Sequence, residues 1–217
     1  MKELGAAMRT RSAEKRREIV RVAAKAFKEL GYERTSMLTI AERLQGSKQT
    51  LYNYFPSKEE LLRAVLDFDV GEVADRAMEE FLAEKNLRKA LIRLGVVYLN
   101  GQLASPAMSN IRIVSTQPAE SNLGEEFYEN VLKPAWKRTA ATFKSLMNEG
   151  RLKRSDPWLA VMHWKGLVLL DLFERRLLGA MKAPDPREVE AAAKGAADAF
   201  LKLYGPDDPV PRPRSRS

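Results

Sequence analysis

The fold is decided by the stretch TSMLTIAERLQGSKQTLYNYF, residues 35–55. Ser36 and Ser47 are residue types that cap helix N-termini, and each precedes a short segment of helical character. The pattern predicts helices over Met37–Leu44 and Lys48–Phe55, separated by a tight turn that contains glycine. Two short helices joined in this way are typical of a helix-turn-helix.

The second of these helices has one polar and one apolar side. A helix that enters the major groove needs hydrogen-bonding side chains on its outer side. The polar residues are Lys48, Gln49, Thr50, Tyr52, Asn53 and Tyr54. Leu51 and Phe55 are four residues apart, as apolar residues facing a core would be. The pattern also fits a three-helix bundle with an ordinary polar surface, but it favours DNA binding.

The charge of the chain is uneven. Of a net charge of +8, residues 1–66 carry +6, from 14 Lys and Arg against 8 Asp and Glu. A basic N-terminal module indicates a polyanionic partner such as nucleic acid. A polyelectrolyte that binds nucleic acid or a membrane surface without sequence preference is the alternative interpretation.

Few kinds of catalytic chemistry are compatible with the composition. The chain has no cysteine and a single histidine, His163, which excludes Cys-ligated metals, thiol chemistry and sites with two imidazoles. Carboxylate pairs such as Asp69 and Glu72 lie on helix faces without a phosphate-binding loop or metal spacing. We interpret them as solvated surface and expect no enzyme, no cofactor and no metal site.

An all-α fold is predicted, because turn residues separate long helical runs and strand alternation is absent. The expected helices span 13–30, 37–44, 48–55, 58–83, 87–103, 107–115, 124–148 with a kink at Pro134, 157–178 and 187–203. The domains expected are a flexible basic arm over 1–12 with Arg9 and Arg11, a helix-turn-helix domain over 13–57, a helical body over 58–204 and a disordered tail over 205–217.

We expect a cytoplasmic protein without a membrane partner. The N-terminal residues 1–11 lack the apolar core of a signal peptide. The longest apolar stretch, Val161–Phe173, is too short to span a bilayer and contains His163, Lys165 and Asp171.

Residues 17–65, REIVRVAAKAFKELGYERTSMLTIAERLQGSKQTLYNYFPSKEELLRAV, resemble the DNA-binding domain of the TetR family of transcriptional regulators. The shared motifs are A-x-x-x-F-x-x-x-G-Y, T-S-x-x-x-I-A, S-K-x-T-L-Y-x-Y-F and S-K-E-x-L. The body is more weakly similar to the AefR-like subgroup, through RIVSTQP from Arg112, FY from Phe127 and GRL from Gly150. The resemblance implies a ligand-responsive repressor that binds a palindromic operator in double-stranded DNA as a homodimer.

The resemblance also assigns roles in DNA binding. It places Lys48, Gln49, Thr50 and Tyr52 at base edges and nearby backbone, with Asn53 beside them, and implies phosphate contacts for Thr35, Ser36, Tyr54 and Lys58. One departure is the turn, where the family usually has Gly followed by an apolar residue and this chain has Gln45 and Gly46. Either Gln45 adopts the left-handed conformation, or the preceding helix is one residue longer and Gly46 makes the turn.

The body is where the family holds a small effector and its dimer interface. The candidates for the effector site, with ordinary core packing as the alternative, are Phe68, Tyr98, Met108, Arg112, Phe127, Trp136, Phe143, Met162, His163 and Lys165. Lys165 is the most informative, because it is a lone cation on an apolar helix face. We expect an apolar or aromatic effector, with an acidic group as a further option. The candidates for the dimer interface, with packing inside one subunit as the alternative, are Leu167, Leu170, Val189, Ala192, Ala193, Ala196, Phe200 and Leu203.

Overall fold

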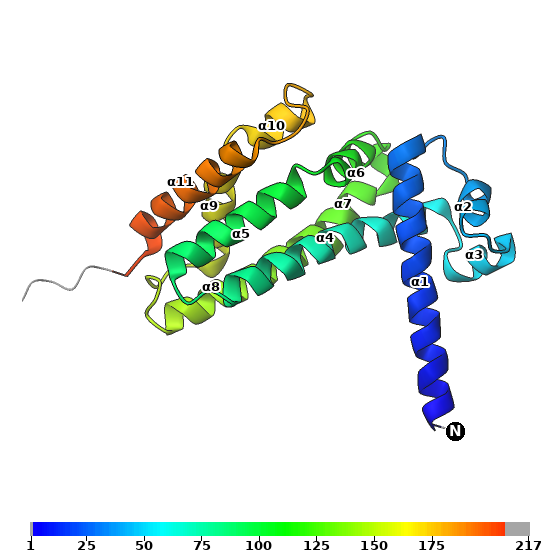
Figure 1. The fold of residues 1–217 in the computed structure, drawn as a ribbon, viewed down its shortest axis with the longest axis horizontal. Coiled ribbons are helices and arrows are strands. Elements are labelled where there is room, and N and C mark those ends of the chain that lie inside the picture. Colours follow the sequence, from blue (N-terminus) through cyan, green and yellow to red (C-terminus); the bar gives the residue numbers. More distant parts are fainter. Residues whose placement is uncertain (1, 207–217) are drawn as a thin grey trace, which may run out of the picture. The chain divides into compact units, whose positions relative to one another are not determined.

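The computed structural model describes the backbone of residues 2–206 and the side chains of residues 12–71, 73–118 and 120–206. Within this part the chain is helical and contains no strand, which confirms the all-α prediction (Figure 1). The helices are α1 (Lys2–Leu30), α2 (Met37–Arg43), α3 (Lys48–Tyr54), α4 (Lys58–Leu82), α5 (Leu87–Gln102), α6 (Ser105–Ser115), η1 (Ala119–Ser121), α7 (Leu123–Phe127), η2 (Tyr128–Leu132), α8 (Lys133–Asn148), α9 (Pro157–Leu169), α10 (Leu172–Leu177) and α11 (Pro186–Tyr204). None of the described helices is long and apolar enough to cross a membrane.

Most predicted helix starts are confirmed by capping hydrogen bonds. The side chains of Ser36 and Ser47 each accept a hydrogen bond from the backbone N–H three residues later, at 3.0 Å in both cases. Asn86 and Asp156 do the same at 3.0 and 2.7 Å. Asp185 caps α11 through the N–H of Arg187 at 2.8 Å. These bonds satisfy backbone donors that the first turn of a helix leaves unpaired.

Two helices begin earlier than predicted by more than one residue. Helix α1 starts at Lys2 rather than at residue 13, so its backbone includes residues 2–12, which were expected to form a flexible arm. Strong helix formers such as Glu3, Ala6 and Ala7 explain the extension. The side chains of Arg9 and Arg11, and the tail beyond Pro206, lie outside the described residues. Helix α6 starts at Ser105, because Pro106 is compatible with the first turn of a helix and does not stop it.

The segment predicted as one kinked helix over 124–148 is three successive elements. Helix α7 passes into the π-helical turn η2, and α8 begins at Lys133, directly before Pro134. Proline has no backbone N–H, and its ring clashes with the carbonyl four residues earlier, which here belongs to Asn130 in the π turn. A wider turn at this point accommodates the proline, as π turns inside helices commonly do.

The segment predicted as one helix over 157–178 is divided at Leu170. Helix α9 ends at Leu169, and Leu170 has φ +46° and ψ −132°, a conformation that residues with side chains rarely adopt. Helix α10 follows from Leu172. The buried side continues across the break, from Trp164 and Val168 to Leu172. No glycine or proline marks this break, so the sequence contained no signal for it.

The chain forms two compact units rather than dividing at residue 57. The N-terminal unit comprises residues 1–72 and 104–132, so it includes α6 and α7 as well as the helix-turn-helix. Its core joins side chains that are far apart in the sequence: Ile19 and Phe27 of α1 and Leu66 of α4 lie in one buried cluster with Leu123 and Phe127 of α7. The boundary between the units therefore differs from the one predicted at residue 57, because the helix-turn-helix shares its core with these later helices.

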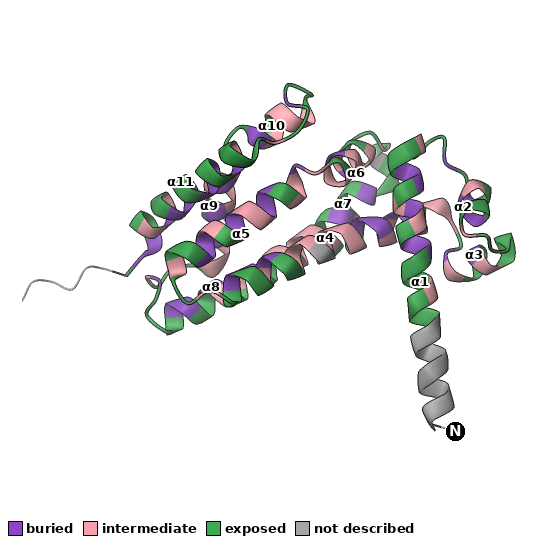
Figure 2. Ribbon diagram, viewed as in Figure 1, coloured by how far each residue is buried: buried purple, intermediate pink, exposed green. Residues whose placement is uncertain are grey.

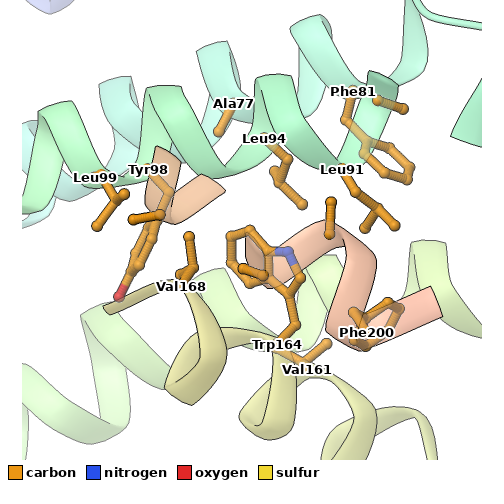
Figure 3. Packing of buried hydrophobic residues seen from close by; sticks show 14 of the residues in the cluster. Ala77, Phe81, Leu91, Leu94, Tyr98, Leu99, Val161, Trp164, Val168 and Phe200 are labelled. Carbon is orange, nitrogen blue, oxygen red and sulfur yellow. The ribbon is translucent and has the colours of Figure 1, made fainter. Parts of the chain in front are cut away.

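The C-terminal unit comprises residues 73–103 and 133–217. Helix α11 packs on α5 and α9, and α9 packs on α8. Trp164 of α9 lies at the centre of the core, between Leu94 of α5 and Phe200 of α11 (Figure 3). Gly95 allows the close approach of α5 to its neighbours, because a Cβ there would lie 3.0 Å from the Cβ of Ala193.

Candidate nucleic-acid interface

The turn between α2 and α3 adopts the first of the two conformations considered for it. Gln45 has φ +50°, in the left-handed region, whereas Gly46 does not have a positive φ. The N–H of Gln45 donates to the carbonyl of Glu42 at 3.0 Å, and that of Gly46 to the carbonyl of Ala41 at 3.2 Å. This pair of bonds is a Schellman motif, which usually has glycine at the position of Gln45.

Replacing Gln45 with glycine should therefore stabilise the protein. A left-handed conformation costs a residue with a side chain about 1–2 kcal/mol, part of which the greater freedom of glycine in the unfolded chain offsets. We expect Gln45→Gly to raise the free energy of unfolding by about 1 kcal/mol, measured by urea denaturation. Gln45→Ala is the control, since alanine removes the side chain but retains the strain. An equal gain in both variants would contradict this explanation.

Helix α3 is held by its apolar side and presents its polar side to solvent. Leu51 is 1 % and Phe55 2 % exposed, and both belong to the core of the N-terminal unit, as predicted. Lys48, Gln49 and Asn53 are exposed, and Tyr52 is 38 % exposed. The short helix therefore projects a row of polar side chains from a packed base. Figure 2 colours most of α3 as exposed or intermediate.

The exposed side chains of α3 are arranged by contacts with one another. The amide of Gln49 donates to the side-chain oxygen of Asn53 at 3.1 Å. The ammonium of Lys48 lies 5.7 Å from the centre of the Tyr52 ring. Thr50 is half-buried, and its hydroxyl is 2.8 Å from that of Ser47. Gln49 and Asn53 are thus paired side by side, with amide groups of the kind that read adenine.

The predicted phosphate contacts differ in accessibility. Thr35 is 1 % exposed, and its hydroxyl donates to the carbonyl of Gly31 at 2.7 Å, so it stabilises the end of α1 and cannot reach a phosphate. Thr35 is therefore removed from the candidate DNA contacts. Ser36 is exposed at the start of α2, and Tyr54 is half-buried against the core.

Lys58 is half-buried and bound to the loop that follows α1. Its ammonium donates to the carbonyl of Tyr32 at 3.1 Å and lies 4.1 Å from the centre of the Tyr32 ring. Burial, assisted by the negative charge of Glu59, raises the pKa of Tyr32 to about 12. The phenol of Tyr32 is therefore neutral at ordinary pH. Lys58 supplies a positive charge next to it.

One basic residue beside α3 was missed by the sequence analysis. The guanidinium of Arg16, in α1, lies 4.9 Å from the centre of the Phe55 ring at the end of α3. The side chain is exposed and so adds a cation next to the polar row. Its spacing from Ile19, Val20 and Ala23 puts it in line with the buried face of α1, a signal that could have identified it.

The effector candidates are divided between the two units. The N-terminal unit contains Phe68, Met108, Arg112 and Phe127, and the C-terminal unit contains Tyr98, Trp136, Phe143, Met162, His163 and Lys165. Met108, Phe127 and Phe143 are buried core residues, and Arg112 is exposed. His163 is also exposed, with Nδ1 2.6 Å from the hydroxyl of Tyr204.

Most of the dimer candidates are buried inside the subunit, which corrects the prediction. Helix α11 packs on α5 and α9, and its small and aromatic residues are buried in the subunit and so unavailable to a partner. In Figure 2 buried and exposed residues alternate along α11. The buried candidates are Val189, Ala192, Ala193, Ala196 and Phe200. Leu167 is half-buried, whereas Leu170 and Leu203 are 60 % and 56 % exposed.

Comparisons with known proteins agree with this geometry. Residues 19–65 match the model of the bacterial regulatory proteins of the tetR family, and residues 89–206 match that of the AefR-like transcriptional repressor C-terminal domain. The HTH-type transcriptional regulator YhgD of Bacillus subtilis is 32 % identical over 89 % of this chain and 95 % of its own length.

Solved structures show the same fold. A TetR-family regulator from Mesorhizobium loti has a TM-score of 0.81 and 29 % identity, over 90 % of this chain and 98 % of the other. The flavonoid-responsive regulator FrrA has a TM-score of 0.67 and 25 % identity, over 90 % of this chain and 100 % of the other.

The helix-turn-helix and its helical body define the class as DNA-binding transcriptional regulators. The chain belongs to the TetR family of these proteins. Homodimers and small-molecule effectors are typical of this family.

Proposed function

We propose that this protein is a homodimeric repressor that binds a palindromic operator through α3 and leaves it when a small apolar or aromatic effector binds. The exposed polar row of α3 on its buried base is the observation that carries the DNA-binding part. Lys48, Gln49, Tyr52 and Asn53 would face base edges, with Thr50 at their margin. Ser36, Tyr54 and Lys58 would contact phosphates, which fix the position of the protein on the duplex.

Sequence preference tests this proposal. Footprinting of the DNA that flanks the gene of the protein should identify a palindrome, and that duplex should then be compared with a scrambled duplex at equal salt. We expect the palindrome to bind at least about 10³-fold more tightly, the lower end for specific regulators. Equal binding of the two duplexes would identify a nonspecific polyelectrolyte instead.

For the dimer, we propose the outer side of α9 and α11. Leu159, Leu170 and Leu203 are large apolar residues that are about half exposed. Gly166 of α9 and Gly195 of α11 are also exposed and would allow close approach of a partner helix. A helix-turn-helix protein that reads a palindrome needs two copies related by a two-fold axis. This side supplies an apolar surface that the subunit itself leaves uncovered.

A charge placed on this surface should separate the subunits. We expect Leu159→Asp to convert a dimer into a monomer, measured by light scattering after size-exclusion chromatography, because a buried carboxylate without a partner is costly. Aspartate is compatible with the first turn of α9, so folding should persist. Leu38→Asp, an equivalent change at an exposed leucine in the first turn of α2, is the control. A Leu159→Asp variant that stays dimeric would exclude this surface.

The response to effector would be a population shift. Helix α4 runs without interruption from the N-terminal unit into the C-terminal unit, since the units divide after residue 72. An effector that binds one conformation of the body better than the other would pivot α4 and alter the spacing of the two recognition helices. The similarity to the flavonoid-responsive regulator FrrA supports an aromatic effector for this chain.

A further inference from the structure

The outer side of α9 is apolar except for one histidine. The exposed residues of α9, a helix whose side chains the structure describes throughout, are Leu159, His163 and Gly166. They follow one another at spacings of four and three residues, which places them along one side of the helix. Leu170, 60 % exposed, comes directly after α9. His163 is therefore the one exposed titratable residue of a helix that otherwise presents apolar groups to its surroundings.

The imidazole of His163 is anchored on one side by its own subunit. Its Nδ1 lies 2.6 Å from the hydroxyl of Tyr204 in α11, and the centres of the two rings are 5.9 Å apart. The ring of Tyr204 stacks on that of Phe200 at 4.8 Å, and its carbonyl accepts the backbone N–H of Lys153 at 2.8 Å. The imidazole is thus held through Nδ1, while the residue remains exposed on the outer side of α9.

A single subunit is able to accommodate both charge states of this imidazole. A phenol hydroxyl can donate to a neutral ring nitrogen or accept from a protonated one, so the bond between His163 and Tyr204 is compatible with either state. Water also solvates a charge on an exposed side chain, so the charge costs the isolated subunit little. Protonation of His163 should therefore leave the fold of the subunit unchanged.

The acids on the helices packed against α9 are already paired. Helix α9 packs on α5, α8 and α11, and the first two contain no Asp or Glu. In the loop before α9, Asp156 is engaged as the helix cap. The charged residues next to Tyr204, through the backbone bond and along the chain, are Lys153 and Lys202, which are both basic. Each acid of α11 pairs with a basic residue at 2.6 Å: Glu188 with Arg175, Glu190 with Lys194 and Asp198 with Arg88.

We propose that His163 lies in the interface between subunits as a neutral imidazole and makes dimerisation, and with it operator binding, sensitive to pH. This inference rests on the proposed function, because it concerns the dimer surface of α9 and α11. The leucines of a partner would exclude water from the ring, and burial disfavours the charged form of a histidine. The dimer then binds fewer protons than two separate subunits. Dimers should therefore dissociate as the pH falls and form as it rises.

The pH dependence of dimerisation tests this directly. Histidine is the residue type whose charge ordinarily changes between about pH 5 and 8, and the chain contains one. Uptake of one proton by each subunit allows the dissociation constant of the dimer to rise by up to about 100-fold per pH unit. We expect it to be at least about tenfold larger at about pH 5.5 than at about pH 7.5, measured by sedimentation with fluorescence detection over a dilution series. Circular dichroism should show the same helix content at both pH values. Equal dissociation constants would overturn the proposal.

Two substitutions hold the charge in opposite states. His163→Arg is permanently charged and should weaken the dimer by about tenfold or more at about pH 7.5, whereas His163→Gln is neutral and should remove the pH dependence. Ala141→Arg, at an exposed residue of α8, is the matched control and should remain dimeric. A His163→Arg variant that dimerises as tightly as the wild type, or a His163→Gln variant that retains the pH dependence, would refute the role of His163.

Failure of the proposed function is recognised separately. A wild type that is monomeric at about pH 7.5 would refute the proposed dimer, whereas a dimer that is indifferent to pH would refute only this inference. Operator binding gives a second measurement, because a palindrome is read by two copies. In fluorescence anisotropy at the same pH, His163→Arg should bind the palindrome more weakly than Ala141→Arg does. Equal affinities of these two variants would overturn the connection between His163 and operator binding.

Discussion

Replacement of Trp164 by alanine should lower the free energy of unfolding by about 3–5 kcal/mol, measured by urea denaturation. The side chain is 1 % exposed and lies among Leu94, Val168 and Phe200, with its ring 5.4 Å from that of Tyr98. Truncation therefore removes a large apolar surface and leaves a cavity that the surrounding helices cannot fill.

Phenylalanine at the same position should cost far less. Among the described residues the indole N–H of Trp164 has no hydrogen-bond partner, although it is buried. An unsatisfied buried donor costs about 1–3 kcal/mol, and Trp164→Phe removes that penalty while keeping most of the apolar volume. Trp158→Ala, at a half-buried tryptophan of α9, is the control and should lose less stability than Trp164→Ala. A Trp164→Phe variant as unstable as Trp164→Ala would contradict the account of the unpaired donor.

Gln49→Ala should relax the preference for one base pair in each half-site of the operator. Gln49 is exposed on α3, and its amide is oriented by Asn53 at 3.1 Å. A good bidentate contact discriminates against the wrong base by about 1–3 kcal/mol. We expect this loss on the operator and little change on scrambled DNA, measured by fluorescence anisotropy at equal salt.

The control for Gln49 keeps the polar row but changes a residue outside it. Glu42→Ala alters an exposed residue of α2 and should leave base preference unchanged. Equal losses of affinity for operator and scrambled DNA in Gln49→Ala would exclude a role in base reading.

Local signals in the sequence predicted the helix-turn-helix well. Caps such as Ser36 and Ser47 act within one turn of backbone, so residue type and spacing suffice to place them. The anchoring residues Leu51 and Phe55 follow from helical periodicity in the same way. Thr35 is the exception, because the phosphate contact predicted for it is wrong. Its side chain is buried against α1 and donates to the carbonyl of Gly31.

Features that depend on tertiary packing were not predictable in this way. Hydrophobicity alone cannot distinguish a face buried inside a subunit from one buried by a partner, so Ala193 and Phe200 were chosen for the dimer interface although α5 and α9 cover them. The end of α9 at Leu170 has no turn residue to mark it. The effector candidates were selected by residue type, and residue type does not reveal that they belong to two units.

The interleaving of the two units limits how this protein can be recombined with its relatives. The chain passes between the units after residues 72, 103 and 132, and Leu123 and Phe127 share a buried cluster with Ile19 and Leu66. A chimera that exchanges only the first 57 residues would place foreign side chains against α6 and α7. To transfer operator specificity intact, an engineered regulator would have to exchange residues 1–72 and 104–132 together, as one discontinuous module.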